Sequence, residues 1–162
     1  MKKLKIYLDT SVISHLDQQD APEKMKQTQE LWEILKTYKY DIVLGTIDYR
    51  ELDDCDEDKK EILYSYLAEI NFEVVEKTEE IEELAREIIE QGILKEKNID
   101  DCIHMATAIL SDCDIIVSWN FRHMVNVDTI NGIRRIALAR RYNTIIDIYP
   151  PNLLLKGEDE ND

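Results

Sequence analysis

Asp9 is the first residue whose type and position indicate chemistry. It directly follows a β-favouring run, residues 4–8, and is followed by two hydroxyl side chains, Thr10 and Ser11. In an open α/β sheet, ligands bind in the crevice beyond the carboxyl ends of the strands, so a carboxylate there faces a pocket. The same residues are typical of a helix start, because their side chains accept hydrogen bonds from the first turn. Asp9 is therefore either a pocket carboxylate or a helix cap.

A second group of candidates lies on the predicted helix 99–110. At about 100° per residue, Asp101, His104 and Ala108 fall within a narrow sector opposite an apolar face, and Asp100 flanks that sector. Carboxylates at a helix start also interact favourably with the helix dipole, which is the alternative for both aspartates. We expect His104 to be packed or to support a site residue rather than to bind a metal.

Glu51 is the third candidate acid. It lies about one helical turn beyond the buried strand-like run 42–46, so a helix starting at the end of that run points Glu51 back toward the strand. Spacing alone does not select Glu51 over Asp48, and solvated surface is the alternative for both.

Two polar side chains follow the strand-like run 114–118. Ser118 and Asn120 stand at alternate positions, so both can face the same crevice as Asp9. The amide oxygen of Asn120 could coordinate a hard cation or hold a water molecule. The alternative for Asn120 is an ordinary turn residue.

Strand-like and helical segments alternate along the chain and must position these side chains. This alternation predicts an α/β fold, a three-layer α/β/α sandwich with a largely parallel sheet of about five strands. No repeat or linker divides the chain, so we expect one domain over residues 1–155, with Pro150-Pro151 ending the organised chain and an acidic, disordered tail at 156–162. The strands are expected at 4–8, 42–46, 72–75, 114–118 and 144–148, and the helices at 23–38, 59–69, 79–91, 99–110 and 129–142.

Composition bounds the kind of protein. With 162 residues, 44% of them hydrophobic, the chain is long enough for a substantial core. A net charge of −15 opposes general, sequence-independent binding to nucleic acid. No apolar run suits a membrane span, and the start of the chain lacks a signal-peptide pattern, so we expect a cytoplasmic protein. The cysteines and histidines are scattered, which argues against a disulfide framework and a zinc site.

In this order, the candidate positions resemble the PIN-domain family of nucleases. The resemblance spans about residues 4–150. Its most specific part is the pattern Asp-x-x-His-x-Ala-x-Ala followed by Ser-Trp-Asn, which looks like the VapC-like toxin branch. The matching segments are Leu8-Asp9-Thr10-Ser11, Glu51, residues 101–108 and Ser118-Trp119-Asn120.

The resemblance implies a ribonuclease that depends on Mg²⁺ or Mn²⁺. It implies that the metal-binding, catalytic acids are Asp9, Glu51 and Asp101, with Asn120 as a fourth catalytic position and with Thr10, Ser118 and His104 supporting them. Hard divalent cations prefer oxygen ligands, and Mg²⁺ uses one or two carboxylates together with substrate phosphate. Crowded carboxylates repel one another, so a bound cation would relieve the site.

Asn120 departs from the family pattern, because many PIN domains carry a fourth aspartate there. An amide cannot supply the same charge, which puts a second metal in doubt and makes hydrolysis with one metal more plausible. One alternative function is a catalytically weak PIN-like module that binds protein or RNA. An aspartyl-phosphate phosphatase is set aside, because Ser11 stands where such enzymes carry the second aspartate of Asp-x-Asp.

RNA must reach the site despite the overall negative charge. We hypothesise that Arg122, Arg134 and Arg135 contact the RNA backbone near the crevice. The resemblance also implies an antitoxin partner that blocks the groove, and a homodimer.

Overall fold

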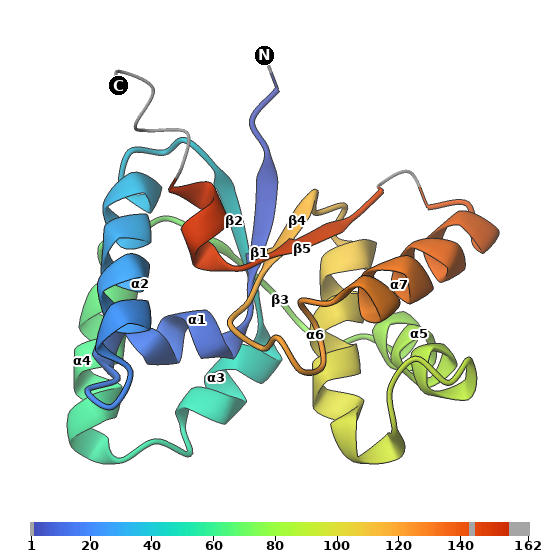
Figure 1. Cartoon of the computed structure of the whole chain (residues 1–162), viewed down its shortest axis with the longest axis horizontal. Helices are drawn as coiled ribbons and strands as arrows, with labels where there is room; N and C mark the ends of the chain where they lie inside the picture. Colours follow the sequence, from blue (N-terminus) through green and yellow to red (C-terminus); the bar gives the residue numbers. More distant parts are fainter. Residues whose placement is uncertain (1, 143–144, 156–162) are drawn as a thin grey trace.

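The computed structural model describes residues 2–142 and 145–155, which form a three-layer α/β/α sandwich (Figure 1). Within these ranges the sheet has the strand order β3-β2-β1-β4-β5, and all four pairings are parallel, as the sequence predicts. The strands are β1 (Lys5–Leu8), β2 (Asp41–Gly45), β3 (Glu73–Val75), β4 (Ile115–Val117) and β5 (Asp147–Tyr149).

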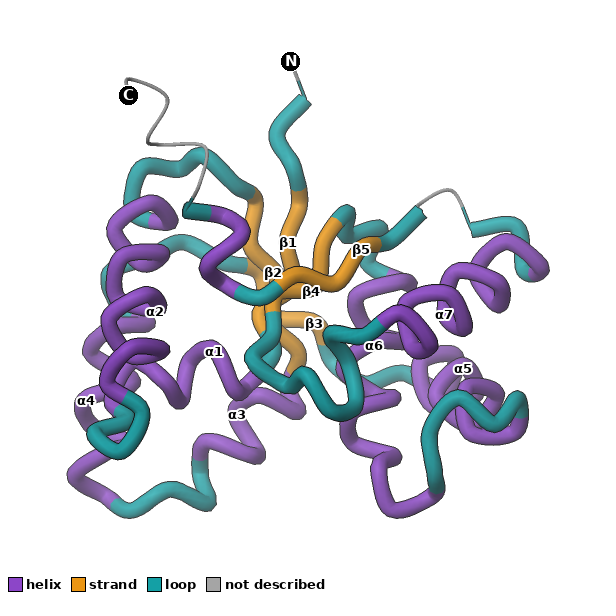
Figure 2. The backbone as a smooth tube through the Cα atoms, in the orientation of Figure 1, coloured by secondary structure: helices purple, strands orange, loops and turns teal. Residues whose placement is uncertain are grey.

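Helices cover both faces of the sheet. Helices α1, α2 and α4 lie on one side of the strands and α5, α6 and α7 on the other, as both ribbon and tube show (Figures 1 and 2). The α-helices are α1 (Thr10–Ser14), α2 (Pro22–Leu35), α3 (Thr46–Leu52), α4 (Glu57–Leu67), α5 (Glu79–Glu90), α6 (Ile99–Leu110) and α7 (Val127–Ala139). Short 3-10 helices are η1 (His15–Asp17), η2 (Glu96–Asn98) and η3 (Pro151–Leu154).

The central strand β1 divides the core into two apolar layers. Successive side chains of a strand point to opposite faces, so Ile6 and Leu8 pack into one layer and Tyr7 into the other. The first layer includes Trp32 of α2, and the second includes Met105 of α6. Because β1 is buried on both faces, the residue that follows it is held in a fixed position.

One helix end differs from the sequence prediction. The helix predicted over 23–38 ends at Leu35. Tyr38 has a φ of 63°, in the left-handed region, which is incompatible with a continuing α-helix. The aromatic side chain of Tyr38 is therefore exposed at a turn instead of lying on the buried face of the helix.

The helix predicted over 129–142 is shifted toward the N-terminus of the chain. It begins at Val127, because the side chain of Asn126 accepts a hydrogen bond of 2.9 Å from the backbone N–H of Thr129. Such a cap satisfies one of the free N–H groups of the first turn. The helix ends at Ala139.

The C-terminal part of the chain shows a second correction. The prediction that Pro150-Pro151 ends the organised chain is wrong, because η3 follows and buries Leu154 in the layer that includes α2. The predicted strand 144–148 corresponds to β5, which begins at Asp147, and Thr144 lies outside the described residues. The predicted tail 156–162 also lies outside them, and the domain boundary at 155 stays a prediction.

In the described part of the chain, no helix is both long and apolar enough to cross a membrane.

Candidate active site

The candidate side chains meet at one edge of the sheet, where the strands β1, β2 and β4 end. Asp9 directly follows β1, α3 begins directly after β2, and Ser118 directly follows β4. Because the strands are parallel, these three ends lie at the same edge, which is named the carboxyl edge below. In Figure 1 this edge lies between α1 and α3 on one side and α6 on the other.

Asp9 is a buried carboxylate rather than a helix cap. It is the residue before α1, but its side chain makes no capping hydrogen bond, so the cap interpretation is wrong. Its Oδ2 atom accepts hydrogen bonds from the hydroxyl groups of Ser11 (2.6 Å) and Ser118 (2.9 Å). The Ser118 contact agrees with the alternation predicted beyond β4. These two hydroxyls hold the Asp9 carboxylate at the strand end.

Glu51 and His104 form a close pair beside Asp9. Helix α3 turns Glu51 back toward the sheet as predicted, and its Oε1 atom lies 2.5 Å from His104 Nε2. The same nitrogen lies 3.5 Å from Asp9 Oδ1. Burial alone would lower the pKa of His104, but the carboxylates of Asp9, Asp48 and Glu51 raise this pKa to about 10. The raised pKa favours the imidazolium form of His104, in which both ring nitrogens are donors.

Asp48 is a site residue that spacing alone did not separate from Glu51. Its side chain is fully buried and accepts hydrogen bonds from the backbone N–H of Gly45 (2.9 Å), from Thr10 Oγ1 (2.8 Å) and from the hydroxyl of Tyr7 (3.2 Å). Burial raises the pKa of this carboxyl to about 7. The sequence contains a pattern that indicates this role. An aspartate at the third position of a helix can accept a hydrogen bond from the backbone N–H of the residue that precedes the helix.

Tyr7 connects His104 to Asp48 and was missed because it lies inside a strand-like run. Its hydroxyl oxygen lies 2.6 Å from His104 Nδ1. With His104 protonated, Nδ1–H donates to Tyr7 and the Tyr7 hydroxyl donates to Asp48. A side chain at position 45 would place Cβ 3.0 Å from this hydroxyl, so Gly45 leaves room for the connection.

Asp101 lies in the first turn of α6 and faces the loop that follows β4. Its Oδ2 atom accepts hydrogen bonds from His123 Nδ1 (3.0 Å) and from the Asn120 side-chain amide (3.5 Å). Burial, and then the negative charge of Asp9, raise the pKa of the Asp101 carboxyl. His123 was not predicted, although it follows Asn120 by three residues and donates its backbone N–H to the Asn120 side-chain oxygen (3.0 Å).

The donor set suits a hard divalent cation. Asp9, Glu51 and Asp101 present carboxylate oxygens from three different elements, and the charge of Asp9 acts on Asp101. A cation placed between these two groups would relieve their repulsion. Among the described residues, no three His, Cys, Asp or Glu side chains already have the arrangement of a metal site.

The three candidate arginines do not lie together. Arg122 is exposed in the loop after Asn120, and Arg135 is exposed on α7. Arg134 instead donates from Nε to the carbonyl of Ile146 (2.9 Å) and forms an ion pair with Asp147. Asp147 begins β5, so the structure places Arg134 near the opposite edge of the sheet.

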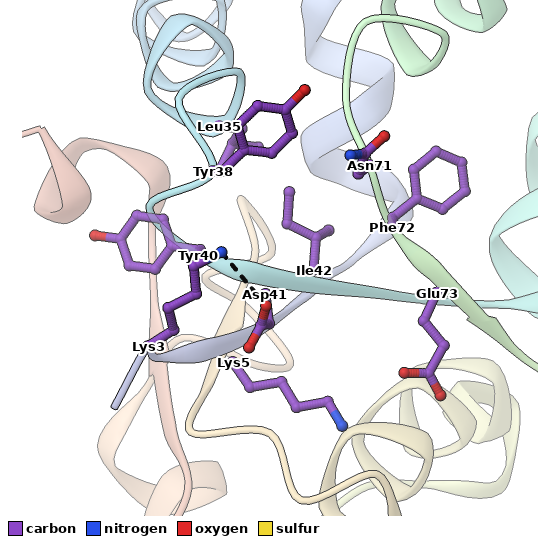
Figure 3. A pocket seen from close by; sticks show the side chains of 10 residues that line it. All are labelled: Lys3, Lys5, Leu35, Tyr38, Tyr40, Asp41, Ile42, Asn71, Phe72 and Glu73. Atoms are coloured by element: carbon purple, nitrogen blue, oxygen red, sulfur yellow. Dashed lines mark ion pairs between the residues drawn. The ribbon is translucent and has the colours of Figure 1, made fainter. Parts of the chain in front are cut away.

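A cavity lies at that opposite edge. It has a volume of about 450 Å³ and is bordered by the starts of β1 and β2 (Figure 3). Figure 3 shows the ion pair between Lys3 and Asp41 and the rings of Tyr38 and Phe72 around the cavity. None of the candidate acids lines it. This cavity is therefore separate from the candidate active site.

The family model of the PIN domain matches residues 6–128. This chain belongs to the PIN-domain family. The fold of this PIN domain is similar to a solved structure described as VapBC2 from Rickettsia felis bound to a DNA fragment from their promoter. That comparison has a TM-score of 0.53 and 14% sequence identity, and it covers 91% of this chain and 98% of the other. A comparison with curated protein sequences gave no match.

Proposed function

We propose that this PIN domain is an endoribonuclease that hydrolyses RNA phosphodiester bonds with Mg²⁺ or Mn²⁺. The observation that carries the proposal is that Asp9, directly after β1, lies at the carboxyl edge together with Glu51 of α3 and Asp101 of α6. Family membership supports hydrolysis, because PIN domains are generally nucleases.

The three acids would hold the metal. When bound, the cation supplies an activated water and neutralises negative charge on the phosphate and the leaving oxygen. Asp9 would be the fixed ligand, because two serine hydroxyls orient its carboxylate. Glu51 and Asp101 would be the other two ligands; in the metal-free protein their carboxylates contact His104 and His123. The neutral amide of Asn120 adds no charge to the set, which favours one metal over two.

His104 has a separate role in this proposal. It is a buried cation that contacts Glu51 and lies near Asp9 and Asp48. Its positive charge offsets the repulsion among these carboxylates before a metal is bound. Thr10 supports the same geometry, because its hydroxyl lies 2.8 Å from Asp48 Oδ1 and 3.0 Å from Glu51 Oε1.

A catalytically weak module that binds protein or RNA is the second candidate. The His104–Glu51 contact favours it, because an imidazolium already neutralises a carboxylate that the nuclease needs as a ligand. The two functions differ in whether a divalent metal produces RNA cleavage.

The similarity of the fold to VapBC2 supports a proposal about the partner of the nuclease. We propose that this chain is the toxin of a toxin–antitoxin pair, that a cognate antitoxin blocks the carboxyl edge, and that the toxin forms a homodimer in the cytoplasm. Arg122 and Arg135 are proposed to contact the RNA backbone, because both are exposed. Arg134 is the weakest of the three candidates, because Asp147 and the Ile146 carbonyl already occupy its guanidinium.

The test is metal-titrated cleavage of a mixed RNA pool by the wild type and by Asp9→Asn. We expect Mn²⁺-dependent cleavage by the wild type and a loss of at least about 100-fold in Asp9→Asn, since the fixed ligand loses its charge. Two adjacent aspartates provide a matched comparison: Asp101→Asn should reduce cleavage, whereas Asp100→Asn should not. Asp100 instead pairs with Arg50 (2.8 Å). Equal cleavage by the wild type and Asp9→Asn would refute the proposal.

A further inference from the structure

An exposed aromatic ring lies next to the candidate active site. Phe121 is 47% exposed and directly follows Asn120, whose amide reaches Asp101. A planar apolar ring at this position can stack against the face of another planar group. None of the contacts that form the carboxylate site uses this ring.

The loop that carries Phe121 is fixed on both sides. Trp119 is buried, its indole N–H donates to Thr28 Oγ1 (2.8 Å), and its backbone N–H donates to Ser11 Oγ (3.0 Å). The side-chain amide of Asn126 donates to the carbonyl oxygen of Phe121 (3.3 Å). The position of Phe121 is therefore set before any ligand arrives, which lowers the entropy cost of binding.

A lysine from another element stands against the same ring. Lys24 of α2 places Nζ 5.6 Å from the ring centre of Phe121 and 5.5 Å from that of Trp119. These distances are those of cation–π contacts, which hold an ammonium group beside an aromatic face. Exposed Arg122 is the next residue along the loop. Cations and an aromatic ring thus lie together beside the acids in a chain of net charge −15.

We infer that Phe121 and Lys24 form a subsite that stacks one unpaired base of the RNA and binds the phosphate beside it. Bases stacked on aromatic side chains, with cations tracking the backbone, are the usual means of holding single strands. A base inside a duplex has no free face for Phe121. The subsite selects an unpaired nucleotide next to the scissile bond, and the inference rests on the proposed nuclease function.

Binding is measured by fluorescence anisotropy in an Asp9→Asn background, so that the result does not depend on cleavage. The probe is a labelled unstructured RNA, together with the same strand carrying abasic positions. Phe121→Ala is expected to weaken binding of the complete RNA about tenfold, whereas Phe121→Trp retains it. The loss should vanish on a fully abasic strand. Tyr38→Ala, an exposed aromatic at the opposite edge, is the control and should bind like its parent.

Lys24 is tested through the salt dependence of binding. Lys24→Ala should reduce the slope of log affinity against log salt by about 0.7, the value for one phosphate contact on a single strand. Lys26→Ala removes an exposed lysine from the same helix and should leave the slope unchanged. Equal slopes for Lys24→Ala and its parent would contradict the phosphate contact.

The results separate this inference from the proposed nuclease. Base-dependent binding that needs Phe121, in a chain without metal-dependent cleavage, would support the subsite and refute the nuclease. Metal-dependent cleavage by a chain whose Phe121→Ala variant binds RNA like its parent would overturn the subsite alone. A chain that does not bind RNA would also overturn it. Circular dichroism of each variant confirms folding, and the exposure of Phe121 makes its truncation compatible with the fold.

Discussion

At the scale of single residues, the candidate site depends on one buried cation shared among several acids. When protonated, His104 donates to Glu51 on one side and to Tyr7 on the other, and Tyr7 donates to Asp48. Each buried polar atom in this series has a partner, which is the condition for burying charge at low cost. Removing one member leaves its neighbours unpaired.

Tyr7→Phe tests this series of hydrogen bonds and keeps the aromatic ring in place. The substitution removes the acceptor of His104 Nδ1–H and a donor to Asp48, so it should lower the free energy of unfolding by about 1–3 kcal/mol. Urea unfolding of the metal-free protein measures the change. Tyr64→Phe is the control, because its hydroxyl contacts Asp53 at the surface (3.3 Å) and should contribute less than about 0.5 kcal/mol. Equal losses of unfolding free energy in Tyr7→Phe and Tyr64→Phe would contradict the role of the buried Tyr7 hydroxyl.

Residue types, spacing and the family resemblance together selected part of this candidate site. Asp9 and Asp101 stand out because one follows a strand and the other lies at a helix start, whereas spacing left Glu51 and Asp48 equal and the resemblance selected Glu51. Tyr7 was not a candidate and the role of Asp48 was not predicted, because both depend on side chains that meet only after β1, α3 and α6 pack together. A tyrosine in an apolar run predicts core packing, and only the position of His104 reveals a polar function for its hydroxyl.

At the scale of elements, the loop after β4 is positioned by α2. The two are far apart in sequence, and the contact is the hydrogen bond from Trp119 to Thr28 inside the core. Thr28 in turn donates its hydroxyl to the carbonyl of Lys24 (2.6 Å). Helix α2 therefore orients both the loop that carries Asn120 and the lysine beside Phe121.

Thr28→Val tests this coupling between elements. Valine keeps the shape but leaves the Trp119 indole N–H unpaired, so the free energy of unfolding should fall by about 1–3 kcal/mol. Thermal or urea unfolding measures the loss. In the control, Thr37→Val removes a hydroxyl that donates to the carbonyl of Ile34 at the surface (2.6 Å), and a smaller change is expected. A Thr28→Val protein as stable as the wild type would argue against the anchor.

At the scale of the whole molecule, the alternation of strands and helices was sufficient to predict the parallel sheet and its two helical layers. The short C-terminal turn was not predictable in the same way. Four residues after a Pro-Pro pair show no periodicity, and only the tertiary packing of Leu154 reveals that they belong to the core. Helix ends were also shifted where a single backbone angle or cap decided them, as at Tyr38 and Asn126.

The net charge of −15 attracts divalent cations to the whole surface, so a specific site must be distinguished from this general attraction. Asp9→Asn and Asp54→Asn change the net charge equally. Asp9 lies at the carboxyl edge, whereas Asp54 is exposed beyond the end of α3. A difference in Mn²⁺ affinity between these two variants therefore comes from the site and not from the net charge.

Calorimetric titration of Mn²⁺ into the wild type and these two variants shows whether the carboxyl edge binds a metal. We expect a saturable site in the wild type, the same affinity in Asp54→Asn, and an affinity at least about tenfold weaker in Asp9→Asn. Absence of saturable Mn²⁺ binding in the wild type, or equal affinities in all three proteins, would contradict the assignment of the carboxyl edge as a metal-dependent active site.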